Sequence, residues 1–236
     1  MTYFETTRWS VVRTAAAGSS SQARHALQTL CSTYWYPLYT YIRHQGNSAE
    51  DAKDLIQEFF TQFLEKDYLN DVDPAKGKFR SFLLASVNHF LSNQRDRARA
   101  VKRGGRVTFL PLDFDSVEER YVGVASQTQS PEKLFDRAWA LATLESTLAR
   151  LRQEYDKSGK SALFDRLKGT LTGQEDRVPY QEVGAELGLS EGAVKVAVHR
   201  LRRRYRDLLL EEIAATLAEG ESVDEELHHL FSAIGT

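Results

Sequence analysis

The chain has 236 residues, 42% of them hydrophobic, a formal net charge of −2 and one cysteine, Cys31. This length and composition allow one or two domains with substantial cores. A lone cysteine excludes an internal disulfide, no run of about eighteen apolar residues is present to span a membrane, and the N-terminus lacks a signal-peptide pattern. We therefore expect a cytoplasmic protein without a membrane partner.

Almost all of the chain has helical periodicity, which predicts an all-α fold of two helical domains joined by a flexible linker. The first domain, residues 1–103, contains a helix that Ser48 caps and that has acids in its first turn. The apolar face of this helix runs from Ala52 to Leu64. A further helix begins near Phe79.

A basic patch closes this first domain. Between Arg95 and Arg106, six Lys or Arg residues stand against one acid. Asn88 and Asn93 precede the patch, and their amides can hydrogen-bond to the edges of bases. Positive charge beside aromatic rings is also how unpaired bases are held, although the phenylalanines here fit a hydrophobic core better. The arginine run favours a nucleic-acid contact over a solvated helix end.

Residues 104–130 form a polar break that we interpret as an acidic linker. Gly104, Gly105 and Pro111 interrupt the helical periodicity. Acids are interleaved with aromatic and aliphatic residues in its middle; the acids are Asp113, Asp115, Glu118 and Glu119. That mixture is unusual for an inert spacer.

The second domain, residues 131–210, begins with a helix that Ser130 caps and whose first residue is Pro131. A short helix follows around Ala162–Leu167, and the domain ends in two short helices joined by a tight turn. Gly188 suits the positive φ of the turn, and Ser190 and Glu191 suit the start of the next helix. We expect Leu189 to fill the space between the two helices. The apolar residues of the second helix recur at steps of three or four and form a stripe that should be buried: Val194, Ala197, Val198, Leu201, Tyr205 and Leu208.

The other face of that helix is cationic and carries Lys195, His199, Arg200 and Arg203. From Glu191 to Arg206 there are six Lys or Arg residues against one acid, a charge density that releases counterions from a phosphate backbone. Shape and charge together predict a helix-turn-helix that reads the major groove of DNA.

Residues 211–236 form an acidic extension. Between Asp207 and Thr236 there are eight acids and no Lys or Arg. A Ser-x-x-Glu capping box at Ser222, followed by apolar residues at helical spacing, predicts a helix. One hypothesis is that this helix docks on the second domain and weakens DNA binding by competing for its positive face. The alternatives are that it completes the core of that domain or offers a surface to a regulator.

Two motifs resemble those of bacterial sigma factors. The Asp51–Phe60 segment resembles their polymerase-binding helix, and the Lys78–Leu83 segment resembles the start of their promoter-melting helix. With the C-terminal helix-turn-helix, the chain resembles the small two-domain sigma factors of the extracytoplasmic-function (ECF) group over residues 23–103 and 131–208. The resemblance implies a transcription initiation factor whose partners are core RNA polymerase and promoter DNA. Whether an anti-sigma protein or another regulator controls it is left open.

The resemblance also implies site residues. Those expected to bind polymerase are Asp51, Asp54, Leu55, Gln57, Glu58 and Phe59. Those expected at the minus-ten promoter element are Phe79, Arg80, Asn88, Asn93, Arg95 and Arg97. Those expected at the minus-thirty-five element are Ser190, Glu191, Lys195, His199, Arg200 and Arg203. The acidic linker would thread the polymerase cleft, where its carboxylates take the place of nucleic-acid charge.

An enzyme is not expected. The chain has neither a P-loop glycine pattern nor a Gly-x-Ser-x-Gly motif, and no Cys/His cluster has the spacing of metal ligands. We therefore expect no catalytic residue, metal or cofactor. The main alternative is a stand-alone helix-turn-helix regulator whose first domain senses a signal or dimerises. A third reading is a helical adaptor that joins other proteins.

Overall fold

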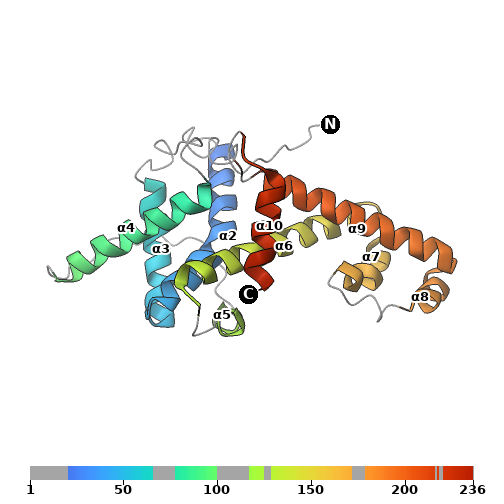
Figure 1. The fold of residues 1–236 in the computed structure, drawn as a ribbon, viewed down its shortest axis with the longest axis horizontal. Helices are drawn as coiled ribbons and strands as arrows, with labels where there is room; N and C mark the ends of the chain where they lie inside the picture. Colours follow the sequence, from blue (N-terminus) through green and yellow to red (C-terminus); the bar gives the residue numbers. More distant parts are fainter. Residues whose placement is uncertain are drawn as a thin grey trace. The chain divides into compact units, whose positions relative to one another are not determined.

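The computed structural model describes residues 21–65, 78–99, 117–124, 129–171, 179–215, 217 and 220–235 (Figure 1). Every regular element in these ranges is a helix, which confirms the predicted all-α fold. The helices are α2 (Ser21–His44), α3 (Ala49–Glu65), α4 (Phe79–Arg99), α5 (Val117–Val124), α6 (Pro131–Lys157), α7 (Ser161–Leu167), the 3-10 helix η3 (Lys168–Leu171), α8 (Tyr180–Leu187), α9 (Glu191–Ala214) and α10 (Val223–Gly235). The predictions on residues 1–20 and 104–116 and on the Arg97 side chain lie outside the described residues.

Tertiary contacts divide the chain into two units. Unit 1 comprises the described residues of Met1–Ala142 and Ile213–Thr236, and unit 2 comprises those of Thr143–Glu212. Helix α6 therefore begins in unit 1 and ends in unit 2. Helix α10 belongs to unit 1, although most of that unit comes from the other end of the sequence.

The core of unit 1 is rich in aromatic side chains. Helix α3 begins as predicted, because the Asp51 N–H donates to the Ser48 Oγ at 3.0 Å. The Phe59 ring of α3 lies 5.7 Å from the Phe90 ring of α4. Apolar residues at helical spacing give α3 a single buried face, which consists of Ala52, Ile56, Phe59, Phe60 and Phe63.

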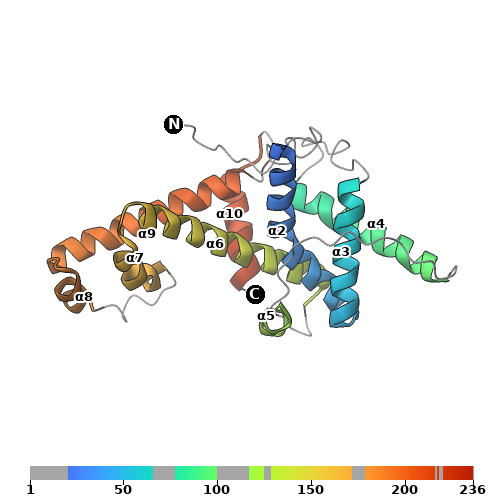
Figure 2. The same cartoon turned by 180° about the vertical axis from the view of Figure 1, so that it is seen from behind.

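The start of α6 and helix α10 complete unit 1. Helix α6 begins at Pro131 as predicted, and the Ser130 Oγ accepts the Lys133 N–H at 3.3 Å. The predicted C-terminal helix is confirmed as α10, whose Glu225 N–H donates to the Ser222 Oγ at 3.4 Å. Figures 1 and 2 show α10 in red, across the first part of α6. Helix α10 packs within unit 1 together with the first turns of α6, which the predicted second domain of residues 131–210 includes, so competition of this helix for the positive face of that domain stays a hypothesis.

Helix α5 lies inside the segment predicted to be a linker. Its Glu118 accepts hydrogen bonds from Arg43 Nη2 at 2.7 Å and from the Tyr39 hydroxyl at 2.6 Å. Burial raises the pKa of Glu118, but these two donors outweigh burial and hold it below its ordinary value. His44 adds a contact of 3.3 Å between its Nδ1 and the Tyr121 hydroxyl. The middle of the segment is therefore a helix fastened to α2, and the charge of Glu118 is already paired.

Unit 2 is built around one small core to which α6, α7, α8 and α9 all contribute. The short helix predicted near Ala162–Leu167 is confirmed as α7. The buried side chains of this core are Leu151, Phe164, Leu167, Val183, Val194, Val198, Leu201 and Leu208. Four of the eight lie on α9, so α9 has one apolar face fixed against the rest of unit 2.

Candidate nucleic-acid interface

Helices α8 and α9 form the predicted helix-turn-helix. Gly188 follows α8 with a φ of 67° and a ψ of 31°, the left-handed conformation that glycine adopts without strain. The Ala193 N–H donates to the Ser190 Oγ at 3.2 Å, which confirms Ser190 as the cap of α9. The Leu189 N–H donates to the Gly184 carbonyl at 2.8 Å and closes the turn.

Gly184 has a role in this turn that the sequence analysis missed. A Cβ atom at this position would lie 2.6 Å from the Leu189 carbonyl oxygen, closer than nonbonded atoms approach. Because glycine has no side chain, the backbone of the turn can pack directly against α8. Leu189 itself is 39% exposed, so the prediction that it fills the space between the helices is wrong. A glycine in the middle of a short helix is the signal that would have pointed to this close approach.

The two faces of α9 are as predicted. Its apolar stripe is buried, with Ala197 and Tyr205 only partly so. The Lys195, His199, Arg200 and Arg203 side chains are all exposed, as are Ser190 and Glu191. Lys195 forms an ion pair with Glu191 at 2.7 Å. No ion pair with another described residue reaches Arg200 or Arg203, so these two cations are available to a ligand.

Two other arginines of α9 serve the fold of unit 2. Arg202 donates to the Thr170 carbonyl from Nε at 3.3 Å and from Nη2 at 3.0 Å. Arg204 holds Glu154 of α6 with two bonds of 2.8 and 2.7 Å. These bonds lower the pKa of Glu154 below its ordinary value. Counting charges along α9 therefore overstates the cations available to DNA.

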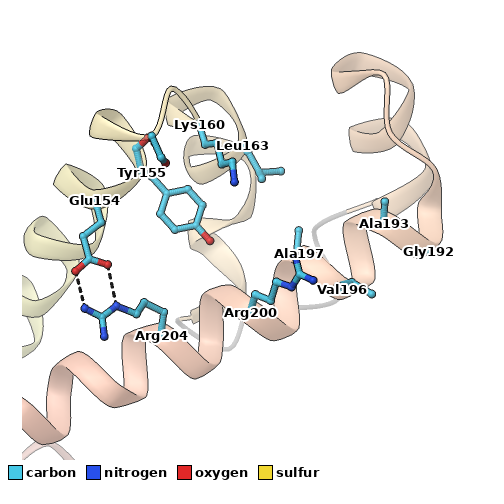
Figure 3. Close-up of a pocket in the computed structure, with 11 residues that line it drawn as sticks. Glu154, Tyr155, Lys160, Leu163, Gly192, Ala193, Val196, Ala197, Arg200 and Arg204 are labelled. Carbon is cyan, nitrogen blue, oxygen red and sulfur yellow. Dashed lines mark hydrogen bonds and ion pairs between the residues drawn. The ribbon is translucent and has the colours of Figure 1, made fainter.

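A groove of about 560 Å³ lies beside the exposed face of α9, within unit 2 (Figure 3). Its walls come from the end of α6, the start of α7 and the first turns of α9. Figure 3 shows Tyr155 and Lys160 on one side and Arg200 on the other, with the Glu154–Arg204 pair at one end. Because Glu154 is paired, Lys160 and Arg200 give the groove a net positive charge.

Three of the residues predicted to contact the minus-ten element lie on the surface of α4. Asn88, Asn93 and Arg95 are exposed. The Asn88 Oδ1 accepts the Tyr41 hydroxyl at 2.8 Å, and Arg95 Nη2 donates to Gln45 Oε1 at 3.0 Å. Tyr41 of α2 and Gln45, the residue directly after α2, thereby orient Asn88 and Arg95 at the exposed surface.

Phe79 and Arg80, in contrast, are buried. The Phe79 ring packs in the core, 5.4 Å from the Tyr34 ring. The Arg80 guanidinium lies 4.3 Å from the Trp139 ring centroid and forms an ion pair with Glu226 of α10. Neither side chain can touch DNA in this conformation, contrary to the expectation from sequence. The reason is that α10 and α6 cover the start of α4, which the periodicity of α4 alone does not reveal.

The acidic face of α3 agrees with the expectation in part. Asp51 and Asp54 are exposed, and Leu55 and Glu58 are half-buried. Gln57 and Phe59 are buried and point into unit 1, so they are not part of the exposed surface. The surface of α3 that a partner can reach consists of Asp51, Asp54, Leu55 and Glu58. Residues three or four positions apart lie on the same side of a helix, so these four form one continuous surface.

Within the described residues, no three His, Cys, Asp or Glu side chains gather as potential metal ligands. In that part of the chain, no helix is both long and apolar enough to cross a membrane. Cys31 is buried, and burial raises the pKa of its thiol to about 12, as for an inert core residue.

The sequence is similar to that of an RNA polymerase sigma factor. It is 29% identical over 175 residues to the ECF RNA polymerase sigma factor SigE of Mycolicibacterium smegmatis. The similarity covers 74% of this chain and 57% of the relative, so the chain spans somewhat more than half of that protein's length. No protein-family model matches the chain, and no solved structure matches it significantly. Together with the all-helical fold, the similarity supports a place for this chain in the sigma factor family of transcription initiation factors.

Proposed function

We propose that this chain is a sigma factor of the ECF type, which binds core RNA polymerase and directs it to specific promoters. The observation that carries the proposal is the helix-turn-helix of unit 2, whose second helix exposes Arg200 and Arg203, neither of which is ion-paired with a residue that the structure describes. In this proposal the polymerase forms the phosphodiester bonds, and this chain supplies promoter choice and strand opening in the cytoplasm. Binding of core polymerase, recognition of the promoter and strand opening are all part of this proposal.

The minus-thirty-five element would be read by α9. Lys195, His199 and Arg203 follow one another at four-residue steps, so they line one face of the helix. Eight residues of α-helix rise about 12 Å, which matches the width of the major groove of B-DNA. Arg200 lies at the edge of this face, beside the groove that it shares with Lys160, where it is suited to a phosphate.

Unit 1 would supply the other two contacts. Asn88 and Asn93 of α4 carry the amide groups that recognise base edges, and Arg95 carries a charge suited to a phosphate. On α3, the acids Asp51 and Asp54 flank the partly exposed Leu55, an arrangement that suits a basic partner helix with an apolar centre. These features support a minus-ten contact through α4 and a polymerase contact through α3.

Run-off transcription tests the proposal. Purified chain is added to bacterial core RNA polymerase with a library of promoter fragments, and the 5′ ends of the transcripts are mapped. We expect defined start sites that core polymerase alone does not use. A stand-alone helix-turn-helix regulator would instead bind duplex DNA and leave the start sites of core polymerase unchanged, and that result would reject the sigma factor proposal.

Charge reversal on α3 tests the polymerase contact separately. Asp54→Lys should abolish capture of core polymerase by the immobilised chain, because an exposed acid in the proposed interface becomes a repulsive cation. Asp224→Lys on α10 is the matched control, since it makes the same charge change at an exposed acid outside both α3 and the acidic linker. Equal capture by the two variants would remove α3 from the interface.

A further inference from the structure

The C-terminal helix α10 places a carboxylate in the interior of unit 1. The Glu226 side chain is 0% exposed and lies between two cations from the start of α4. It accepts a hydrogen bond from Arg80 Nη2 at 3.2 Å and is ion-paired with Lys78. Asp136 of α6 lies 3.7 Å from Arg80 Nε, and the Trp139 ring covers the guanidinium. A cluster of two cations and two acids, of which Arg80 and Glu226 are buried, therefore joins α10 to α4 and α6.

This cluster fixes the register of α10 on unit 1 more than it contributes to the free energy of docking. Removing charges from water offsets much of the attraction between them, so a buried ion pair is weak evidence for stability but does fix one register. Burial and the positive charge of Arg80 lower the pKa of Lys78, so the two cations repel each other. The Glu226 carboxylate forms an ion pair with both of them.

The apolar face of α10 is only partly covered. Leu230 is buried, but Phe231 of the predicted apolar stripe is 54% exposed, and Leu227 is only half-buried. A helix of 13 residues is marginal on its own in water. An anion that binds Lys78 and Arg80 would therefore compete with Glu226, the α10 side chain that pairs with both cations.

We infer that α10 is an internal competitor of nucleic acid for the basic start of α4. The covered residues, Lys78 to Arg80, open the segment that resembles the promoter-melting helix, whereas Asn88 and Asn93 farther along α4 are exposed. DNA phosphates and the Glu226 carboxylate are alternative partners of the same two cations. In the docked state α4 presents only its exposed part, and release of α10 adds Lys78 and Arg80 to the DNA-binding surface. The inference rests on the proposed function, because it concerns control of the same DNA contact.

Binding of a short labelled single-stranded oligonucleotide of mixed sequence tests the inference, without polymerase. Glu226→Gln and deletion of residues 221–236 should each tighten binding, by about fivefold at 0.1 M salt for each cation that gains a phosphate, with a salt slope steeper by about 0.7 per contact. Asp224→Asn is the control, because it removes a charge from an exposed acid of the same helix. Adding Arg80→Ala to the deletion should remove most of the gain.

The emission of Trp139 reports whether α10 has left, since Arg80 lies against that ring. If the Trp139 emission changes but the affinity for the oligonucleotide stays that of wild type, the inference is overturned. It is also overturned if Glu226→Gln and Asp224→Asn tighten oligonucleotide binding equally, because that result would show a general charge effect. If Glu226→Gln leaves α10 docked, the deletion decides by the same criteria, and a deletion that unfolds unit 1 would show that α10 is an integral part of the fold and overturn the inference. Run-off transcription separates the two proposals: a wild-type chain that starts no transcription refutes the proposed function alone.

Discussion

Replacing Gly184 with valine should destabilise unit 2. The first added carbon would lie 2.6 Å from the Leu189 carbonyl oxygen, and that oxygen belongs to the backbone of the turn, so it cannot rotate away. The turn would have to move off α8, and the bond from the Leu189 N–H to the Gly184 carbonyl would lengthen or break. The substitution therefore acts on the geometry that positions α9.

The magnitude follows from these two effects. Overpacking of a close contact costs about 1–3 kcal/mol. Loss of one backbone hydrogen bond adds about 0.5–1.5 kcal/mol, and the better helix propensity of valine returns a few tenths. We expect the free energy of unfolding of unit 2 to fall by about 2–4 kcal/mol.

Urea unfolding followed by far-UV circular dichroism measures this change. The three tryptophans, Trp9, Trp35 and Trp139, all precede unit 2, so their emission reports on unit 1 in the same titration. Gly192→Val is the matched control, because a Cβ there meets nothing closer than the Ser190 Oγ at 4.0 Å. We expect that control to stay within about 0.5 kcal/mol of wild type. Equal unfolding free energies for the two variants would refute the reasoning.

Three further predictions concern single side chains. In salt titrations of duplex DNA binding, Arg203→Ala should weaken binding and flatten the salt slope by about 0.9 if it loses one phosphate contact. In denaturation experiments, Arg202→Ala should mainly lower the stability of unit 2. Because Arg204 lowers the pKa of Glu154 below its ordinary 4.5, the charged form stabilises the fold above that pH, and the contribution is lost as pH falls through the lowered value. Wild type should thus lose more stability than Glu154→Gln between about pH 5 and pH 3. Cys31 should react with a thiol reagent at pH 8 roughly a hundredfold more slowly in the native protein than in urea.

The helix-turn-helix could be predicted from the sequence because its signals are local. Gly188 has the positive φ expected of it, Ser190 caps the next helix, and the apolar stripe of α9 faces the core. Local signals also gave the start of α6 at Pro131 and the existence of α10. In each case the residues that decide the structure lie within a few positions of one another.

Several failures depend on contacts between distant parts of the chain. Periodicity shows that a helix has an apolar face, but it does not show what covers a charged residue such as Arg80, whose partner Glu226 lies 146 positions away. Helix α5 is short and weakly amphipathic, so its stability depends on the contact of Glu118 with α2. On α3, the resemblance placed Gln57 in the polymerase contact, yet its side chain lies on the inward face next to Ile56. A resemblance carried over residue by residue does not show which face of the helix each side chain takes in this fold.

The pairing of Arg43 with Glu118 joins residues 75 positions apart and turns the stretch between them into a closed loop. The entropy of closing such a loop grows only with the logarithm of its length. Ten extra residues between α4 and α5 would change the closure free energy by only about 0.1 kcal/mol. The segment between α4 and α5 is therefore a thermodynamically favourable place to insert an affinity tag or a fluorescent label, because the Arg43–Glu118 ion pair closes a longer loop at almost the same free energy.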